Sequence, residues 1–224
     1  MSLPEDTRER ILEAAASAFG EKGYDDATVR DICQRAGANL AAVNYYFGDK
    51  EQLYLELVKQ AHRLREEQVP LPAWPVGTPP AEKLRGFIRT TIIRMVDDPA
   101  PQWQMQLMMR EMFRPTKTCL TLVQDFFRPH FTLLLDILQE LVPGATEQKR
   151  HLLGFSIIGQ CLHYRVARPV VELLVGEEEN ARYTAEVLAD HIAEFSLAAL
   201  KAKDGGKMPS VPLESDRLEQ GSTA

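Results

Sequence analysis

Residues 28–50, TVRDICQRAGANLAAVNYYFGDK, contain start and end signals for two short helices in the N-terminal part of the chain. The Thr28 hydroxyl is placed to accept a hydrogen bond from the amide of Asp31, which caps the start of a short helix. Gly37 then ends that helix, because glycine adopts the left-handed conformation at helix ends without steric cost. A second short helix is predicted over residues 39–46. Two short helices joined by a glycine turn form a helix-turn-helix pattern.

Helices on both sides of this motif are predicted from similar end signals. A first helix over residues 6–22 starts with Asp6 and Glu9 as a capping box and ends at Gly23. Its apolar residues recur at helical spacing: Ile11, Leu12, Ala15, Ala18 and Phe19. A further helix, capped by Asp49, follows the motif and extends to the proline-rich stretch.

That stretch, residues 69–80, contains five prolines and cannot continue a helix, so we expect a loop there. Beyond it, Pro129 and Pro169 are expected to kink or split two of the predicted helices. The helices predicted after the loop cover residues 80–97, 101–113, 115–142, 146–175 and 178–203.

No stretch shows the alternation of a strand, so the expected fold class is all-α. We expect an N-terminal three-helix, helix-turn-helix domain over residues 1–50, followed by a larger helical bundle domain over residues 51–203. Residues 204–224 are polar and rich in Gly, Ser and Pro, and we expect a disordered tail there.

The composition is that of an ordinary globular protein, with 45% apolar and 26% charged residues. No signal peptide and no apolar run long enough to span a membrane is found, so we expect a cytoplasmic protein. The three cysteines, Cys33, Cys119 and Cys161, have no zinc-binding spacing and are expected to be reduced thiols. No metal and no cofactor is expected.

The histidines do not indicate an enzyme. Five of them are scattered along the chain, with no nucleophile elbow, no HExxH motif and no glycine-rich phosphate loop. They are His62, His130, His151, His163 and His191. We therefore expect no catalytic residues.

The segment Ala36–Gly48 carries no charged side chain, which suits a helix that approaches base edges in the major groove of DNA. Asn44 can pair with an adenine edge, and Leu40 and Ala41 can contact thymine methyl groups. Groups suited to phosphate contacts or to the rim of the groove are Thr28, Arg30, Tyr45, Tyr46 and Lys50. A second interpretation is equally open at this point: three short helices that merely pack together, with Tyr45 and Phe47 as core aromatics.

The charge balance gives no general attraction to DNA. The net charge is −6, and residues 1–68 hold nine Lys and Arg against thirteen Asp and Glu. Any DNA binding must therefore depend on the local placement of a few cations.

The run Arg10–Val58 closely resembles the DNA-binding domain of the TetR family of regulators. The matching phrases are I-L-x-A-A-x-x-x-F-x-x-x-G-Y from Ile11, T-V-R-D-I-C-x-x-A-G from Thr28 and Y-F-G-D-K-E-x-L from Tyr46. The phrase NLAAVNYYF, residues 39–47, resembles the subgroup that includes CecR-type regulators.

The resemblance implies DNA contacts at matching positions of this chain: Thr28, Asn39, Leu40, Ala41, Asn44, Tyr45, Tyr46 and Lys50. Many members have Gly at the position of Ala41 and an aromatic residue at that of Asn44, and most of the subgroup has His at that of Tyr46. The operator sequence therefore cannot be copied from relatives. The resemblance also implies a homodimer that forms through the last two long helices, a palindromic DNA operator and a small-molecule effector bound by the helical domain.

A methionine-rich segment is the first candidate for the effector site. Four Met residues recur at helical spacing, which is typical of a core face and also of an adaptable apolar pocket. The residues considered as ligand contacts there are Trp103, Met105, Met108, Met109, Arg110, Met112 and Phe113. Four polar residues on otherwise apolar helices are suited, as a group, to orient one polar group of a mostly apolar ligand: Arg110, Gln160, His163 and Tyr164.

Two other interpretations stay open. The cysteines could make the protein a DNA-binding redox sensor, with Cys33 inside the predicted DNA-binding domain. Alternatively, the chain could be a helical ligand-binding or partner-binding protein without effector control, or a DNA-binding activator. The effector, the operator and the sign of regulation are not determined by the sequence.

Overall fold

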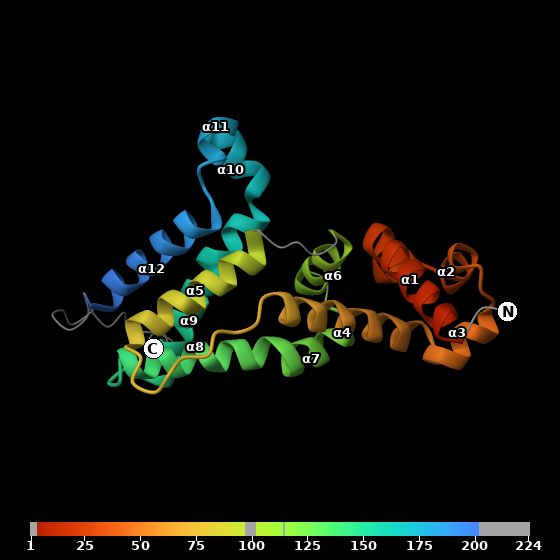
Figure 1. The fold of residues 1–224 in the computed structure, drawn as a ribbon, viewed down its shortest axis with the longest axis horizontal. Coiled ribbons are helices and arrows are strands. Elements are labelled where there is room, and N and C mark those ends of the chain that lie inside the picture. The colour runs from red at the N-terminus through yellow and green to blue at the C-terminus, as the bar shows by residue number, and fades with distance from the viewer. Residues whose placement is uncertain (1–3, 97–101, 114, 202–224) are drawn as a thin grey trace, which may run out of the picture.

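The computed structural model describes residues 4–96, 102–113 and 115–201. Within these ranges every regular element is helical, which confirms the all-α prediction. The molecule is elongated, with α1, α2 and α3 at one end and α10, α11 and α12 toward the other (Figure 1). The expected tail over residues 204–224 lies outside the described residues.

The N-terminal helices are α1 (Pro4–Asp26), α2 (Val29–Ala36), α3 (Leu40–Phe47) and α4 (Lys50–Gln68). The predicted caps between them are confirmed. Thr28 Oγ1 accepts from the amide of Asp31 at 3.1 Å, and Asp49 Oδ1 accepts from the amide of Gln52 at 2.8 Å. Gly37 ends α2 with φ 59°, a left-handed conformation that glycine adopts without strain. These caps fix the relative directions of α2, α3 and α4.

The first helix begins at Pro4, two residues before the predicted Asp6, and its predicted end at Gly23 is confirmed. The residues up to Asp26 form a second helical stretch within α1, joined to the first across a kink. Gly23 forms this kink with φ 83°. Gly23 therefore bends the chain, and one more helical turn follows before α2 begins.

One hydrophobic core joins these helices. It includes Phe19 of α1, Ile32 of α2, Val43 of α3 and Leu53 of α4, each fully buried. Leu107 of α6 (Gln102–Phe113) also belongs to this core, so a helix that follows the proline-rich loop completes the packing of the N-terminal helices.

The proline-rich segment is a loop as predicted, and helix α5 (Pro80–Val96) begins at its end. Trp74 of the loop lies against α5 so closely that a Cβ on Gly86 would be 3.1 Å from the indole Nε1. The buried Arg94 of α5 donates from Nε to the carbonyl of Val69 at 2.7 Å. The loop is therefore held against α5 at its start and in its middle.

Pro129 interrupts the predicted helix over residues 115–142. The segment consists of α7 (Thr118–Leu122), a π-helical turn η1 (Val123–Phe127) and α8 (Arg128–Leu141). Proline lacks the amide hydrogen that an α-helix uses, and it is tolerated at the start of a helix. Its place at the start of α8 fits this split.

The last predicted helices are divided as well. Pro169 separates α9 (Glu147–Val166) from α10 (Arg168–Val175), as predicted. The helix predicted over 178–203 is wrong, because α11 (Glu177–Asn180) stops before α12 (Ala185–Lys201) begins. Thr184 Oγ1 accepts from the amide of Val187 at 3.3 Å, so this threonine caps a new helix instead of continuing the old one.

A second hydrophobic core is formed by α5, α8, α9 and α12, with Phe87, Leu134, Ile157 and Ile192 among its buried residues. No helix among the described residues is long and apolar enough to cross a membrane. The described structure thus has two cores, and α4 and α6 lie between α1, α2 and α3 on one side and the remaining helices on the other (Figure 1).

Candidate DNA-binding surface and regulatory contacts

Helix α3 exposes an uncharged surface. Tyr45 is 82% exposed and Leu40 57%, and Ala41 and Asn44 are exposed beside them. Phe47 is buried in the first core. The interpretation of Tyr45 and Phe47 as a pair of core aromatics is therefore right for Phe47 and wrong for Tyr45. Large apolar side chains at this exposure indicate a binding surface.

The side chains of two residues in the same segment make contacts within the protein. Asn39 caps α3, and its Oδ1 accepts from the amide of Ala42 at 2.9 Å. Tyr46 is half-buried against the first core, and its ring meets the Tyr45 ring edge to face at 5.0 Å between centroids. Asn39 and Tyr46 therefore fix the position of α3 and of the exposed Tyr45 ring.

Two cations border this surface without a carboxylate partner in the described part of the chain. Arg30 is exposed on the first turn of α2. Lys50 opens α4, where its Nζ lies 4.6 Å from the centre of the Tyr24 ring and donates to the carbonyl of Asp25 at 3.3 Å. Among residues 4–63, Lys59 is the other cation outside the ion pairs of the described structure, and it lies further along α4.

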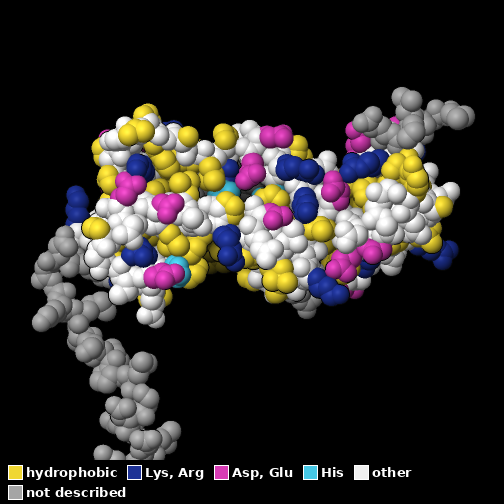
Figure 2. Space-filling view, turned by 90° about the horizontal axis from the view of Figure 1, so that it is seen from below, with side chains coloured by type: hydrophobic (Ala, Val, Ile, Leu, Met, Phe, Trp, Pro, Cys, Tyr) yellow, Lys and Arg dark blue, Asp and Glu magenta, His cyan; other side chains and the backbone are white. Residues whose placement is uncertain are grey.

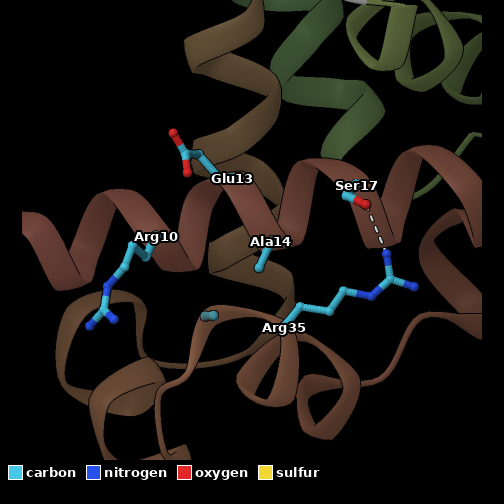
Figure 3. A pocket seen from close by; sticks show the side chains of 6 residues that line it. Arg10, Glu13, Ala14, Ser17 and Arg35 are labelled. Atoms are coloured by element: carbon cyan, nitrogen blue, oxygen red, sulfur yellow. Dashed lines mark hydrogen bonds between the residues drawn. The ribbon is translucent and has the colours of Figure 1, made fainter.

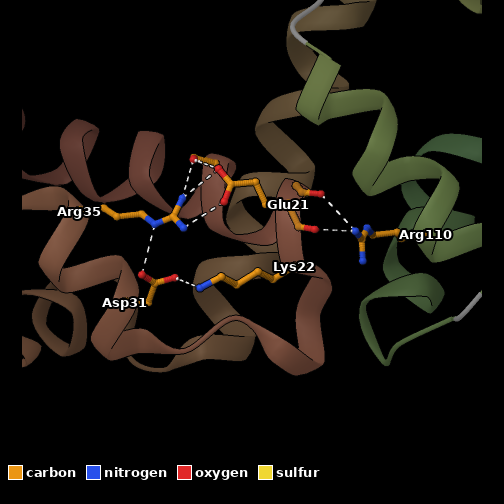
Figure 4. A network of polar contacts seen from close by, with 7 residues as sticks. Glu21, Lys22, Asp31, Arg35 and Arg110 are labelled. Carbon is orange, nitrogen blue, oxygen red and sulfur yellow. Dashed lines mark hydrogen bonds and ion pairs between the residues drawn. The ribbon is translucent and has the colours of Figure 1, made fainter.

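The remaining cations of the N-terminal helices are paired with acids. Arg35 contacts Glu21 at 3.0 Å and Asp31 at 3.3 Å, and Lys22 contacts Asp31 at 2.7 Å (Figure 4). The hydrogen bond from Arg35 holds the pKa of Glu21 below its ordinary value, and the one from Lys22 does the same for the pKa of Asp31. Arg8 pairs with Glu56, and Arg10 lies 3.7 Å from Asp6.

In the described structure these ion pairs engage four acids, on α1, α2 and α4, and five cations on the same helices. Arg30 and Lys50 are outside these ion pairs, beside α3. Figure 2 shows positive and negative side chains interspersed on the face seen from below, with no continuous basic stripe there. The arrangement suits a local contact to DNA phosphates on both sides of a base-reading helix.

Comparisons with known proteins show which family the chain belongs to. A family model for bacterial regulatory proteins of the tetR family matches residues 11–57. A second model, for the C-terminal domain of the HTH-type transcriptional dual regulator CecR, matches residues 80–200, more than half of the chain. This chain belongs to the TetR family.

Relatives of this TetR-family regulator differ in how much of the chain they match. CecR of Shigella flexneri is 28% identical over 205 residues, 84% of this chain and 90% of that protein. The repressor AcnR of Corynebacterium efficiens is 42% identical over 64 residues, 28% of this chain and 34% of that protein. Like these relatives, the protein is a DNA-binding transcription regulator. The expectation that it is not an enzyme is confirmed by its family.

Solved structures share the fold. The hemolysin II regulator HlyIIR matches with a TM-score of 0.56 at 22% identity, covering 86% of this chain and 98% of that one. A TetR-like regulator from Rhodococcus sp. RHA1 matches with a TM-score of 0.55 at 17% identity, covering 88% and 97%.

The methionine-rich helix of this TetR-family regulator faces the N-terminal core. Met108 is buried in that core, Met105 is also buried and Trp103 packs at the edge of the core. Met109 is half-buried, whereas Met112 and Phe113 are exposed. The core interpretation therefore holds for Met108, and the stripe as a whole does not line one closed cavity.

Arg110 contacts α1. Its Nη2 donates to the carbonyl oxygens of Gly20 at 3.3 Å and Glu21 at 3.0 Å, on the side of the N-terminal helices (Figure 4). A Cβ on Gly20 would lie 3.0 Å from the Trp103 Cβ, so α1 and α6 approach closely. The structure thus gives Arg110 a role in joining two helices.

Of the four polar residues expected to orient a ligand, Arg110 lies on α6 and the other three lie on α9. Helix α9 packs mainly on α5, α8, α10 and α12, whereas α6 packs mainly on α1, α4 and α7. Gln160 is half-buried and donates to the carbonyl of Ser156, and His163 is exposed. Tyr164 packs at the edge of the second core. The structure therefore does not gather the ten expected ligand residues into one cluster.

Two hollows are formed by the described residues at other places. A small cavity of about 40 Å³ includes Tyr164, Arg168 and Tyr183 in its wall, and it holds little more than one water molecule. A broad hollow of about 630 Å³ lies between α1 and α2, lined by charged or small side chains that include Arg10, Glu13 and Arg35 (Figure 3). Neither has the size and apolar lining typical of an effector pocket.

Sequence reasoning missed the buried polar group between α4 and α6. Tyr54 and Glu111 are each 1% exposed, and the Tyr54 hydroxyl donates to Glu111 Oε1 at 2.8 Å. Glu111 follows Met108 by three positions, so a carboxylate stands on the buried side of an apolar helix. That placement was the available sign of a buried partner, because a lone charge is costly to bury.

The cysteines are free thiols in the structure. Burial raises the pKa of Cys33 and of Cys119, and it raises the pKa of Cys161 to about 12. Thiolates are the reactive form, so these environments disfavour the redox interpretation. Among the described residues, no group of three His, Cys, Asp or Glu side chains is placed to hold a metal ion.

Proposed function

We propose that this TetR-family regulator is a homodimeric repressor that binds a palindromic operator and is released from it by a small, mostly apolar effector. The observation that carries the proposal is the exposed, uncharged surface of α3 between the two cations Arg30 and Lys50, which lack carboxylate partners in the described structure. In this proposal residues 1–50 read the DNA and residues 51–203 bind the effector and form the dimer.

Helix α3 would enter the major groove. Asn44 is exposed and is suited to a two-point contact with an adenine edge, and Leu40 and Ala41 are suited to thymine methyl groups. The Tyr45 hydroxyl, Lys50, Arg30 and Thr28 would contact phosphates at the groove edges. Asn39 and Tyr46 would act mainly by holding α3 in place, since their side chains are engaged within the protein.

Exposed apolar residues on α9 and α12 support the dimer. Leu152 and Phe155 on α9 are 54% and 60% exposed, and Val187 and Phe195 on α12 are 51% and 60% exposed. Gly159 follows Phe155 by one helical turn, and a Cβ there would meet nothing within 4 Å. A two-fold pairing of these helices would bury the exposed side chains and place two copies of α3 about 34–36 Å apart on one face of the DNA.

Release would follow from a shift between two arrangements of the helices. In one of them, the two copies of α3 no longer match the spacing of the operator half-sites. An effector that favours this arrangement needs about 1–3 kcal/mol of coupling to reduce operator occupancy usefully. The segment Phe47–Leu57, which leads from α3 into α4, connects the DNA-binding surface to the rest of the molecule. The word "dual" in the name of the Shigella flexneri relative supports activation at some promoters as a second mode.

The test is selection of bound fragments from sheared genomic DNA by the purified full-length protein, followed by a binding titration on the best site. Enrichment of a palindrome bound by a dimer at nanomolar concentration is the expected result. Compounds related to the products of flanking genes are then tested for release of that site. Absence of any enriched sequence, with the protein folded, would contradict the proposal.

A further inference from the structure

Glu111 on α6 has a buried carboxylate with several hydrogen-bond donors around it. Its oxygens accept hydrogen bonds from the Tyr54 hydroxyl at 2.8 Å, from the Thr116 amide at 3.1 Å and from the Thr116 hydroxyl at 3.0 and 3.1 Å. Thr116 lies on the connection between α6 and α7, and its Oγ1 in turn accepts from the amide of Thr118 at 3.2 Å. Glu111 therefore ties this connection to α4.

From Tyr54 a chain of ring contacts leads to the edge of α3. The Tyr54 ring meets Phe19 at 4.9 Å and Tyr24 at 4.9 Å between centroids. Tyr24 is the ring over which the Lys50 ammonium lies, at 4.6 Å. Three contacts thus connect a buried acid of α6 to a cation beside the candidate DNA surface.

We infer that Glu111 and Tyr54 position Lys50 for its phosphate contact, so that operator affinity depends on the state of the α6–α7 connection. This inference rests on the phosphate contact proposed above for Lys50. It assigns Glu111 and Tyr54 as positioning residues, which touch neither DNA nor effector in this proposal.

The physical reason is the cost of leaving a buried polar group without a partner. If the α6–α7 connection moves, Thr116 no longer satisfies Glu111, and the carboxylate must shift or gain water. Tyr54 is held to Glu111 by its hydroxyl and to Tyr24 by its ring, so a shift of the carboxylate displaces both rings. Burial and the bond to Glu111 raise the pKa of Tyr54, which keeps its hydroxyl a donor at physiological pH.

The partners of the Lys50 ammonium within the described structure hold it weakly. Its partners in the described structure are the Tyr24 ring and the carbonyl of Asp25, with no carboxylate to hold it. A cation restrained by a ring face is sensitive to the placement of that ring. Its availability to a phosphate is therefore sensitive to Tyr24 and, through it, to Tyr54.

The experiment is a double-mutant cycle between Tyr54→Phe and Lys50→Gln in the full chain, read as operator affinity across a salt titration. Tyr54→Phe removes one hydroxyl and keeps the ring. We expect it to weaken operator binding roughly three- to tenfold and to lower the slope of log affinity against log salt by about 0.9, the value for one phosphate contact. The double variant should bind no more weakly than Lys50→Gln alone.

Controls separate this effect from a loss of stability. Tyr183→Phe removes a hydroxyl from a half-buried tyrosine in the second half of the chain, and it should leave affinity and salt slope unchanged. Thr116→Val removes one donor to Glu111 without touching α4, and it should shift the salt slope in the same direction as Tyr54→Phe. If a urea titration shows that Tyr54→Phe is not stably folded, Thr116→Val serves as the test variant in its place.

The outcomes distinguish this inference from the proposed function. An unchanged salt slope for Lys50→Gln would show that Lys50 makes no phosphate contact, which would contradict the proposed function of Lys50 itself. The positioning role alone would be overturned by a different combination of results. In that case Lys50→Gln lowers the salt slope, Tyr54→Phe leaves it normal, and the losses of affinity add in the double variant.

Discussion

The Lys50 ammonium lies 4.6 Å from the centre of the Tyr24 ring, a cation–π contact that joins the start of α4 to the end of α1. Arg35, in contrast, has two carboxylate partners. Cations of the N-terminal helices thus have different surroundings, and we propose that this difference separates those that contact DNA from those that are paired within the protein.

Arg30→Gln and Lys50→Gln are expected to lower the salt slope of operator binding by about 0.9 each, because each removes one phosphate contact. Arg35→Gln and Lys22→Gln should leave the slope unchanged, since their charges are already paired with Glu21 and Asp31. Fluorescence anisotropy on the selected operator from low to moderate salt measures all four. Equal slope changes in the four variants would contradict the assignment.

Asn39→Ala is expected to lower the free energy of unfolding by about 1 kcal/mol, because it removes the cap of α3. Asn44→Ala is the matched control on the same helix, with its side chain exposed. Urea titration should place its stability within about 0.5 kcal/mol of the parent protein. Its operator discrimination at one base pair should fall by about 1–3 kcal/mol if Asn44 reads an adenine. Unaltered discrimination would remove Asn44 from the reading surface.

Gly23→Ala is expected to destabilise the protein by about 1–3 kcal/mol, because an L side chain is strained at φ 83°. The added Cβ would also lie 2.4 Å from Arg110 Nη1, so the contact of Arg110 with α1 must shift. Gly144→Ala, which places its Cβ in open space, should change stability by less than about 0.5 kcal/mol. Chemical denaturation of both variants checks this, and equal stability would show that the bend tolerates side chains.

Phe155→Ser combined with Phe195→Ser is expected to shift the protein from dimer to monomer, because both rings are exposed on the helices proposed to pair. Val76→Ser, at a fully exposed position of the proline-rich loop, is the control and should not change the mass. Analytical ultracentrifugation over a range of concentrations gives the dissociation constant. A dimer of unchanged affinity would place the interface on another surface.

Alkylation of Cys161 in the native protein is expected to remain slow up to pH 10. Burial disfavours the thiolate, which raises the pKa to about 12, so the reactive fraction grows with pH but stays small in that range. Urea should restore rapid reaction by exposing the thiol. Peptide mapping of the alkylated protein identifies the modified cysteines. Rapid labelling of Cys161 at pH 7.5 without denaturant would revive a redox role.

The helix ends could be read from the sequence because they depend on neighbouring residues. Thr28, Gly37, Asn39 and Asp49 act within three or four positions of themselves, and each ends or begins a helix as the local pattern indicates. Thr184 caps α12 in the same local way, although the predicted helix over 178–203 did not include this break. Because the cap depends on neighbouring residues, the break between α11 and α12 is also encoded locally.

The expected effector residues show where the sequence is insufficient. Helical spacing placed four methionines on neighbouring turns of one helix, and the structure turns Met108 into the N-terminal core while leaving Met112 exposed. Arg110 and Gln160 were grouped by polarity, yet they lie on helices that pack against different neighbours. Spacing within one helix cannot say which other helix packs on each face.

The all-helical fold, the helix-turn-helix and the uncharged face of α3 could be predicted from the residues alone, because they follow from caps, periodicity and the side chains present along the chain. Which charged side chains pair with one another depends on how the helices pack. Lys22 is neutralised by Asp31, nine residues away, and Arg35 by Glu21, fourteen away, whereas the Tyr54–Glu111 bond spans 57 positions. Electrostatic pairing and burial depend on distance in space, which is fixed when the helices pack together.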